Sequence, residues 1–557
     1  MNTLSTTTDV LIVGAGPTGL ALANVLAQYD VSFFVIDRES GPTNQSRAAI
    51  VHIRTLELWD KLGVADPAIA DGVKVHGVNL LINGKQVTHF PLAAREGVPS
   101  PFPFVLAYPQ GQTEQLLLKN LNTDRYPVVW QTELIGFTPA NNGVRTVIRR
   151  SDGVLQEIDT RYVIGADGAN SLVRRLSNVD FPGTTYAPTA FLADVVLDPP
   201  PDASTIQLNL ANGGFVGILA LGEGRYRLFG ALSPKYAAAF QSQNEGRTVS
   251  IEDLQRWFEE YFYMSNRITR ADWTSIYRIH HRLADHFRSE RIFLLGDAAH
   301  IHAPAGGQGM NLAIGDAFNL GWKLALVLRN EVHEEVLDSY EIERRPVAQT
   351  ILRGADRGFE LEATQNSIIE LFRLYVLPSI INGVARFRAV RGVIFQLFSQ
   401  TWINYRSSPV VKTTQRVRQQ KGICAGDRAP HGMFQDGLNR GLSIFALLCG
   451  PDHHLLVFEG LQSAVPHTEL VNVLQTLLDT YRIKIQIHTI TQSNCELHMR
   501  YHMTSPGIVL VRPDGHIAYI GGADDLVSLG QFLDQWYVRK SAIVVHDDSG
   551  ITTASHT

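Results

Sequence analysis

Cysteine is scarce in this sequence: Cys424, Cys449 and Cys495 are the only three among 557 residues. They lie far apart and form no Cys-x-x-Cys pair, which argues against a disulfide framework and against a cysteine-based zinc site. Sparse cysteine is typical of proteins in a reducing compartment, so we expect a cytoplasmic location.

A long uninterrupted hydrophobic run is also missing. The most apolar long segment, residues 371–398, is broken by Arg373, Arg386, Arg388 and Arg391. The N-terminal segment has no basic region followed by an apolar stretch. We therefore expect neither a membrane-spanning helix nor a secretory signal.

Positive charge is not in excess. The 49 Lys and Arg residues against 54 Asp and Glu give a formal net charge of −5, and no basic cluster stands out. Nucleic-acid binding requires a basic face that neutralises phosphates, so nucleic acid is not expected as a partner. The hydrophobic content of 45% is ample for a large core, and the length predicts two to four domains.

A dinucleotide-binding pattern is present near the N-terminus. An apolar strand is followed by glycines in GxGxxG spacing, a helix, and a second apolar strand ending in an acidic residue; the marked positions are Gly14, Gly16, Gly19 and Asp37. The first glycine permits a tight turn, the second lets the backbone approach a diphosphate, and the third allows close helix–strand packing. The helix start offers free N–H groups to phosphates, and the aspartate can accept hydrogen bonds from ribose hydroxyls. This pattern does not distinguish NAD from FAD.

Two later segments favour FAD. In "VIGADGANSLVRR", Asp167 follows an apolar strand, and in "RIFLLGDAAHIHAPAGGQGMN" a buried strand ends at Gly296-Asp297. Asp297 is suited to the hydroxyls of a ribityl chain, and the glycine-rich loop after it can lay backbone N–H groups along a flat ring. The helix expected from about Met310 would stabilise negative charge on a reduced flavin. The alternative is an ordinary glycine-rich surface loop.

The three motifs, in this order and spacing, resemble those of the group A flavoprotein monooxygenases, the aromatic hydroxylase family that includes phenol hydroxylase and the polyketide hydroxylases. The resemblance covers residues 8 to about 350 and includes "SRAAIVHIRTLELWDKLGV", "YPQGQTEQLLL" and "LDSYEIERRPVA". The "GDRAP" segment and the pattern after it are similar to the thioredoxin-like C-terminal domain of the phenol hydroxylase subset, without a Cys-x-x-Cys motif.

The resemblance implies an FAD-dependent monooxygenase. NADH or NADPH would reduce FAD, dioxygen would form a C4a-hydroperoxyflavin, and one oxygen atom would pass to a small phenolic or polyketide-like aromatic substrate. It also implies a homodimer. The alternative is a flavin dehydrogenase or oxidase on the same fold that abstracts hydride directly from its substrate.

Motifs and resemblance together assign a set of residues to the cofactor. These are Gly14, Gly16, Gly19, Asp37, Arg38, Arg47, Gln110, Asp167, Asp297, Pro304, Gly306, Gly307, Gly309, Met310 and Asn311. No metal is expected, because His300 and His302 have no third ligand at zinc spacing.

Two residues are candidates for catalysis. The family's acidic residue before the Arg-Thr-Leu-Glu segment corresponds to Ala49 here, and His52 is a possible substitute for proton transfer; packing or cofactor contact is the alternative. Arg227 could contact an anionic or phenolic substrate, and a solvated strand face is the alternative.

We therefore predict an α/β (α+β) chain with a Rossmann-type FAD-binding domain, an inserted antiparallel-sheet substrate domain and a C-terminal thioredoxin-like domain. The predicted boundaries are residues 1–75, 108–180 and 281–375 for the FAD domain, 76–107 and 181–280 for the substrate domain, 376–420 for a helical linker, 421–540 for the thioredoxin-like domain and 541–557 for a disordered tail.

Overall fold

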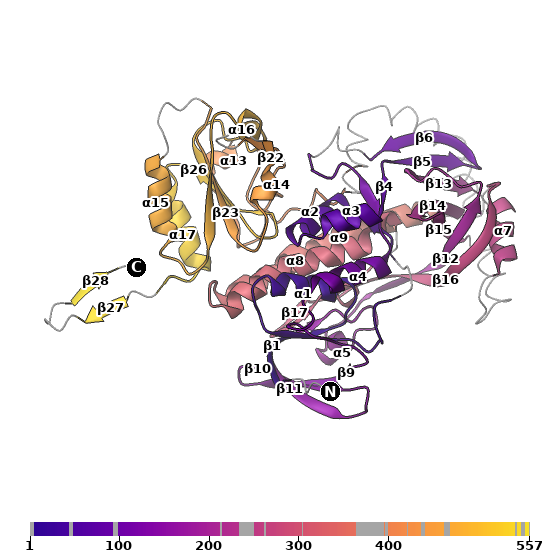
Figure 1. Ribbon diagram of the computed structural model, residues 1–557, viewed down its shortest axis with the longest axis horizontal. Helices are drawn as coiled ribbons and strands as arrows, with labels where there is room; N and C mark the ends of the chain where they lie inside the picture. The colour runs from indigo at the N-terminus through magenta and orange to yellow at the C-terminus, as the bar shows by residue number, and fades with distance from the viewer. Residues whose placement is uncertain are drawn as a thin grey trace. The chain divides into compact units, whose positions relative to one another are not determined.

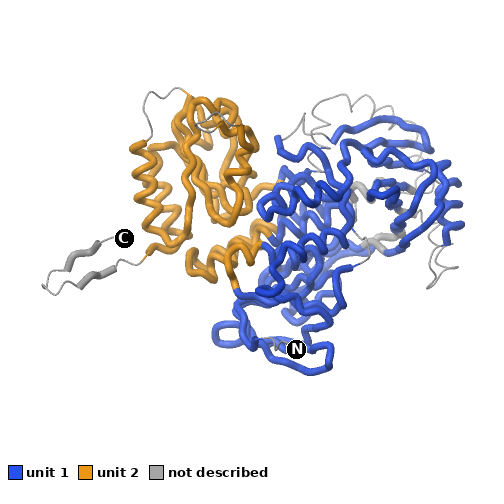
Figure 2. The backbone as a smooth tube through the Cα atoms, in the orientation of Figure 1, with its two compact units in different colours: residues 1–24, 32–317, 345–402 blue, residues 25–31, 318–344, 403–557 orange. Residues whose placement is uncertain are grey.

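The computed structural model divides the chain into two compact units (Figure 2). Unit 1 contains residues 1–24, 32–317 and 345–402, and unit 2 contains residues 25–31, 318–344 and 403–557. The structure describes residues 5–43, 48–92, 99–211, 214–232, 250–260, 263–302, 305–363, 395, 399–419, 422–435, 441–461, 468–540, 543–546 and 552–555. The elements are labelled in Figure 1.

The first sheet of unit 1 is parallel at its centre. Its path runs β17 (Arg288–Ser289), β18 (Ile292–Leu294), β11 (Leu155–Gly165), β1 (Thr7–Val13), β2 (Phe33–Ile36) and β8 (Val128–Val129), and β10 (Gly143–Arg149) and β9 (Glu133–Ala140) extend it from β11. β1 is parallel to both β2 and β11. Val10, Leu11 and Ile12 are fully buried, as expected for a central strand covered on both faces.

The second sheet of unit 1 is mostly antiparallel. Its order is β19 (His300–Ile301), β16 (Arg267–Leu283), β12 (Gly183–Asp198), β15 (Arg225–Leu232), β14 (Gly214–Gly222), β13 (Thr205–Ala211), β5 (Gly77–Ile82) and β6 (Lys85–Pro91). Helix α7 (Ile251–Glu260) packs Leu254 and Phe258 onto one face, in a core with Tyr226 and Leu228 of β15. Because strand side chains alternate, Arg227 and Phe229 lie on the opposite face.

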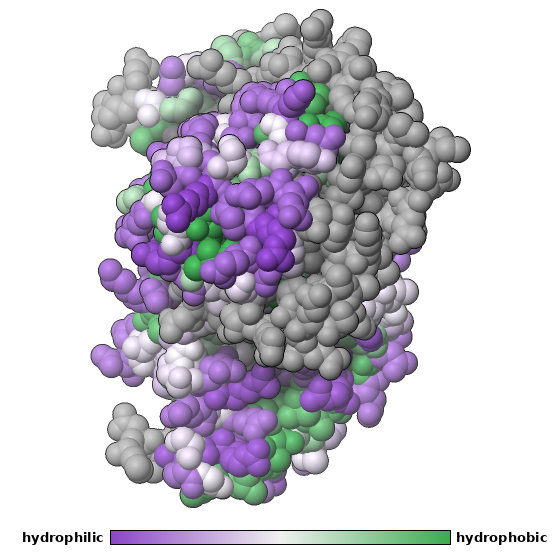
Figure 3. Space-filling view, turned by 90° about the vertical axis from the view of Figure 1, so that its right-hand side faces the viewer, coloured by the Kyte–Doolittle hydropathy of each residue, from purple (hydrophilic) through white to green (hydrophobic). Residues whose placement is uncertain are grey.

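The side of unit 1 that carries α7 is polar where the structure describes it. Figure 3 shows mostly hydrophilic residues there, with hydrophobic ones confined to small patches. This agrees with an amphipathic α7 that buries Leu254 and Phe258 and leaves its acidic residues outside. The face opposite α7 is the one available to a site inside unit 1.

The remaining elements of unit 1 connect the two sheets. The helices are α1 (Pro17–Ala27), α2 (Ile53–Lys61), α3 (Ala65–Asp71), α4 (Gln110–Asn120), α5 (Leu172–Leu176), α8 (Gln308–Leu328) and α9 (Ser339–Ala363), of which α1, α8 and α9 continue into unit 2. A small sheet joins β3 (Ile50–Val51), β7 (Val105–Ala107) and β4 (Val73–Val75). The short 3-10 turns η2 (Gly296–Ala298) and η3 (Ala305–Gly307) precede α8.

Unit 2 contains a five-stranded sheet. Its order is β20 (Lys412–Thr413), β26 (Ile517–Gly522), β25 (Gly507–Val511), β23 (His453–Phe458) and β24 (Ile485–Ile490), and the helices around it include α15 (Thr468–Leu478), α16 (Cys495–Arg500) and α17 (Leu526–Trp536). β23 is parallel to β24 and antiparallel to β25, and β25 is antiparallel to β26. From β23 to α17, the order along the chain is therefore β-α-β-α-β-β-α, and β20 precedes this series.

Most expected elements are observed, with two differences. The long helix begins at Gln308, two residues before the predicted start. The predicted disordered tail, 541–557, instead contains the paired strands β27 (Ile543–His546) and β28 (Thr552–Ser555), because β-branched residues such as Val544 and Val545 favour strands. Of the predicted linker, 376–420, only residues 395 and 399–419 are described, and the domain boundaries within the units remain predictions.

Candidate functional site

The GxGxxG turn has the geometry of a phosphate-binding loop. Gly14 has φ +108°, and a Cβ there would lie 2.3 Å from the carbonyl oxygen of Ala166. A Cβ on Gly19 would lie 1.9 Å from the carbonyl oxygen of Gly14, whereas one on Gly16 would meet no atom within 4 Å. Gly14 and Gly19 therefore serve the packing of the turn, and Gly16 faces the open space that a diphosphate requires.

Asp37 is held beside this turn. Its Oδ2 accepts a hydrogen bond of 2.6 Å from the N–H of Ala15, and its Oδ1 accepts one of 2.9 Å from the N–H of Glu39. The carboxylate is thus fixed at the end of β2 in a partly exposed position, as ribose recognition requires. The neighbouring Arg38 is exposed and lies 3.5 Å from Glu39.

The main chain around Asp297 is anchored on both sides. The N–H of Gly296 donates to Asp316 Oδ2 at 3.1 Å, and this oxygen also contacts His300 Nε2 at 2.7 Å. On the other side, Arg174 donates to the carbonyl oxygen of Ala298 at 2.8 Å. The Asp297 side chain is exposed, so the turn presents a carboxylate to the solvent-accessible side while both flanks are buried.

Gly296 lies in close contact with two helices. Its φ is +58°, and a Cβ there would lie 2.7 Å from Thr18 Oγ1 of α1 and 3.0 Å from Ala313 Cβ of α8. Gly296 thus packs between the first turn of α1 and the second turn of α8. The first N–H groups of a helix have no intrahelical partner and carry the positive end of the helix dipole.

The loop before α8 is attached to the start of α2. His52 Nε2 contacts the carbonyl oxygen of Gly306 at 2.9 Å, and Asn311 Nδ2 donates to the carbonyl oxygen of Gly307 at 2.8 Å. A Cβ on Gly307 would lie 2.9 Å from Ile50 Cβ. His52 and Asn311, predicted separately from the sequence, are brought together here.

His52 is an uncharged side chain in this position. It is completely buried, and burial lowers the pKa of His52 to about 4, although the hydrogen bond to Gly306 raises it. Because a carbonyl oxygen only accepts, Nε2 carries the proton, and Nδ1 is left with no hydrogen-bond partner among the described residues. The role of His52 in proton transfer remains a prediction.

Other predicted cofactor residues occupy supporting positions. Asp167 Oδ2 accepts from the N–H groups of Leu172 and Val173 at the start of α5, while its Oδ1 is buried without a hydrogen-bond partner in the described part of the chain. Gln110 donates to Glu114. Gly309 is partly exposed and Met310 is buried in the first turn of α8. Arg47 and Pro304 lie outside the described residues.

Arg227 is paired rather than free. Its guanidinium donates to both carboxylate oxygens of Asp194, at 2.8 and 2.9 Å, and the arginine side chain is 3% exposed. Asp194 is its direct partner across β12 and β15, and the Trp273 ring lies 5.8 Å from the guanidinium. Tyr277 is on the same face of the sheet, and burial raises its pKa to about 12. Arg227 is thus not on a solvated strand face.

Three supporting residues were not assigned a role from the sequence. Asp316 binds Gly296 and His300, Arg174 binds Ala298, and Glu114 accepts from the N–H of Thr43. Asp316 had a signal, because it is an ionisable residue in an otherwise apolar, buried stretch of α8, whereas Arg174 and Glu114 lie in helices of mixed character. The partner of each lies far along the chain and could not be inferred from spacing.

The residues present fit FAD. Gly16 faces open space, the Asp37 carboxylate is a fixed acceptor, and Asp297 presents an exposed carboxylate on an anchored main chain. A buried oxygen of Asp167 without a hydrogen-bond partner among the described residues follows the neighbouring strand β11. Asp37 would bind the adenosine ribose, the starts of α1 and α8 would bind diphosphate and ring, and Asp297 would bind the ribityl chain.

Comparison with known proteins agrees with this geometry. Residues 7–355 match the FAD binding domain family. The chain is 30% identical to pentachlorophenol 4-monooxygenase of Sphingobium chlorophenolicum over 95% of this chain and 89% of that one, and 35% identical to 6-methylpretetramide 4-monooxygenase of Streptomyces rimosus over 65% and 63%. The substrate-free rebeccamycin biosynthetic enzyme RebC superposes with a TM-score of 0.73 at 27% identity, over 96% of this chain and 99% of that one.

The chain belongs to the FAD binding domain family. Within it, the chain is an FAD-dependent aromatic monooxygenase that uses dioxygen, and NAD(P)H is the reductant typical of these enzymes. The alternative of a flavin dehydrogenase or oxidase is not favoured. In the described part of the chain, no helix combines the length and apolar character that a membrane span requires.

Proposed function

We propose that this enzyme hydroxylates a small phenolic or polyketide-like aromatic compound, with FAD bound along the starts of α1 and α8 and with NADH or NADPH as the electron donor. FAD supplies the activation of dioxygen and the transfer of one oxygen atom to the ring. The protein binds both partners, excludes water and orients the ring to be oxidised.

The observation that carries this proposal is the attachment of the second sheet to the cofactor loop. β19, which comes between Asp297 and the Gly306–Gly307 turn, is the edge strand of the second sheet and pairs with β16 at Arg282 and Leu283. Ile50 touches Gly307 and also belongs to the apolar core that packs against Phe229. The sheet face opposite α7 is therefore turned toward the cofactor loop, and we assign it to the substrate.

That face is suited to a flat aromatic molecule. The Phe229 ring lies over Gly217, where a Cβ would be 2.0 Å from the ring, so a glycine is required for the ring to lie flat. Because Asp194 neutralises Arg227, a neutral or phenolic ligand near Trp273 is favoured over a carboxylate. Two of the similar proteins act, by name, on pentachlorophenol and on 6-methylpretetramide, which supports this substrate class.

The test is the fate of dioxygen. Purified enzyme is screened with phenols and polycyclic polyketides for substrate-stimulated NAD(P)H oxidation, and the product mass is measured under ¹⁸O₂. Gain of one labelled oxygen supports the proposal. NAD(P)H consumption without label in the product contradicts hydroxylation, and bleaching of the flavin by substrate alone under anaerobic conditions would indicate a dehydrogenase or oxidase.

We further propose a thioredoxin-like domain over residues 421–540, with a structural or dimerisation role in a cytoplasmic homodimer. The β-α-β-α-β-β-α order and the sheet order β24-β23-β25-β26 support the fold. Disulfide chemistry is not proposed, because the chain has no Cys-x-x-Cys pair. Deletion of residues 421–557 should change the stability or the oligomeric state, the latter measured by analytical ultracentrifugation. Unchanged stability, activity and oligomeric state would contradict the role.

A further inference from the structure

Two consecutive glycines of the cofactor loop have left-handed backbones. Gly306 has φ +71° and Gly307 has φ +64°. The carbonyl oxygen of Gly306 is held by His52 Nε2 at 2.9 Å, and that of Gly307 by Asn311 Nδ2 at 2.8 Å. In a trans peptide the C=O and N–H groups point in opposite directions. Holding these two carbonyls on the protein side therefore turns the N–H groups of Gly307 and Gln308 the other way.

The Asn311 amide has a single possible orientation. Its Oδ1 accepts from the N–H of His52 at 2.8 Å and from Thr55 Oγ1 at 2.7 Å, while its Nδ2 also donates to the carbonyl oxygen of Ile50 at 2.8 Å. Together with the bond to Gly307, these contacts fill both donor and both acceptor positions of the amide. His52, Thr55 and Asn311 are each at most 1% exposed, so solvent does not compete for these bonds.

We propose that His52 and Asn311 form a carbonyl clamp, which aims the N–H groups of Gly307 and Gln308 at the flavin ring and favours its reduced, negatively charged form. The clamp rests on the FAD site proposed above, and it makes His52 a positioning residue. N–H groups fixed in advance toward a developing negative charge stabilise it without reorganisation. His52 acts on the ring through Gly306.

The ionisation of His52 agrees with positioning rather than with proton transfer. Nε2 carries the proton and is engaged with Gly306, and burial lowers the pKa of His52 to about 4. A free phenol titrates near pH ~10, far from a match with such a base. The Nδ1 atom has no hydrogen-bond partner among the described residues that could support a charged ring.

The experiment replaces the donor and keeps the ring. His52→Phe leaves the carbonyl of Gly306 without its hydrogen-bond donor. We expect the dissociation constant of FAD to be about tenfold higher for the variant. If the affinity for reduced FAD falls a further tenfold beyond the loss for oxidised FAD, the midpoint potential decreases by about 30 mV. Fluorescence titration of apoprotein with FAD and dye-linked redox titration measure the two effects without any substrate. His52→Gln, which retains a side-chain N–H donor, should recover part of both.

Two further variants keep the test decisive. Trp59→Phe is the matched control, because Trp59 lies in α2, which begins directly after His52, is fully buried, and has an indole nitrogen without a hydrogen-bond partner in the described residues. It should leave the FAD affinity and the potential unchanged. If His52→Phe does not fold, Thr55→Val removes one of the two donors to Asn311 and should weaken FAD binding about threefold, with a lower potential.

The clamp is overturned if His52→Phe retains the wild-type affinity and potential, including the case in which only the pH profile of turnover changes. It is also overturned if Trp59→Phe produces the same losses, since the effect would then be a general loosening of α2. Wild-type protein that binds no FAD contradicts the cofactor site itself. A failure to find a hydroxylated substrate contradicts the proposed reaction and leaves both clamp measurements interpretable.

Discussion

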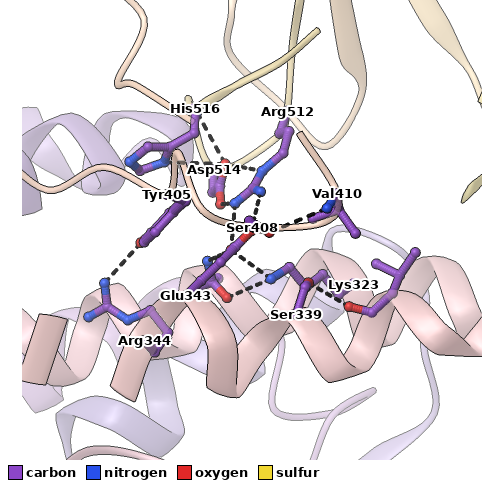
Figure 4. A network of polar contacts seen from close by, with 12 residues as sticks. Lys323, Ser339, Glu343, Arg344, Tyr405, Ser408, Val410, Arg512, Asp514 and His516 are labelled. Carbon is purple, nitrogen blue, oxygen red and sulfur yellow. Dashed lines mark hydrogen bonds and ion pairs between the residues drawn. The ribbon is translucent and has the colours of Figure 1, made fainter. Parts of the chain in front are cut away.

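Arg512, which follows strand β25, forms a bidentate ion pair with Glu343 of helix α9, 169 residues away in the chain (Figure 4). The two hydrogen bonds measure 2.7 and 3.0 Å, and the side chains are 1% and 0% exposed. Lys323 of α8 and Ser408 also donate to this carboxylate. Arg512 further contacts Asp514. Within unit 2, the sheet and the two helices thus share one buried ionic network.

We expect Arg512→Met to destabilise the protein strongly. Arg512 pairs with two buried carboxylates, Glu343 and Asp514, and Lys323 alone would remain to compensate Glu343. Breaking a buried ion pair by removal of one partner typically costs about 3–5 kcal/mol. Urea unfolding followed by circular dichroism measures this. Arg416→Met is the control, because Arg416 pairs with Asp524 while 57% exposed, and it should change the unfolding free energy by less than about 1 kcal/mol. Equal effects of the two variants would contradict the importance of the network.

Because of Glu343, the free energy of unfolding should decrease at acidic pH. Burial by itself raises the pKa of Glu343, but Arg512 and Lys323 outweigh it and lower the pKa from 4.5 to about 2. A carboxylate with a lowered pKa in the folded state contributes stability that is fully present above the unfolded pKa and is lost as the pH falls through the folded pKa. The advantage of wild type over Glu343→Gln should therefore shrink by about 1.4 kcal/mol per pH unit below pH ~4.5. The exposed Glu496→Gln serves as control, and a constant difference across this range would refute the assignment.

Substitutions at Gly16 and Gly19 should have different consequences. A side chain at Gly16 meets open space, so Gly16→Val should fold and melt as the wild-type apoprotein does but bind FAD at least about 100-fold more weakly, because it occupies the diphosphate position. Gly19→Ala places its Cβ 1.9 Å from a backbone oxygen and should lower the melting temperature. The melting temperature of apoprotein and the FAD dissociation constant separate the two. A yellow, fully active Gly16→Val variant would exclude the proposed diphosphate position.

Asp297→Ala should weaken FAD retention without affecting the fold. The side chain is exposed, whereas the flanking main chain is held by Asp316 and Arg174. Loss of the hydrogen bonds that ribityl hydroxyls would donate to a charged acceptor corresponds to about 1.5–3 kcal/mol, or roughly 10- to 150-fold in affinity. The flavin content after gel filtration and the affinity of apoprotein report the change. Asp124→Ala, another exposed aspartate, should behave as wild type; if both variants retain flavin equally, the ribityl chain lies elsewhere.

Asp194→Asn should alter substrate preference. The substitution removes the charge that neutralises Arg227 across the two strands. The buried guanidinium then favours an anionic ligand, at a cost in stability of about 3 kcal/mol or more. The ratio of kcat/KM for a carboxylated phenol to that for its neutral analogue should rise. An unchanged ratio would indicate that Arg227 does not reach the substrate.

Local sequence patterns were sufficient to predict the cofactor and most of the helices and strands. The GxGxxG turn depends on residues within six positions of one another, and strand and helix periodicity is likewise local, so Gly14, Gly16 and Gly19 could each be assigned a role. The close contacts at Gly14 and Gly19 fit their packing roles, and the role of Gly16 toward a diphosphate stays a prediction. The start of α8 was predicted within two residues for the same reason. Arg47 and Pro304 lie outside the described residues and stay predictions.

The sequence by itself determined that the protein uses a flavin and predicted which chain segments bind it, because backbone conformation at a glycine turn and the dipole of a helix start depend on near neighbours. Only the tertiary structure decided the partners of the buried polar groups. His52 and Gly306 are 254 residues apart, and Arg227 is paired with Asp194 by strand register. The protonation state and the role of a buried charge or ring nitrogen depend on the group that the fold brings within hydrogen-bond distance. The separation of two residues along the chain does not predict that distance.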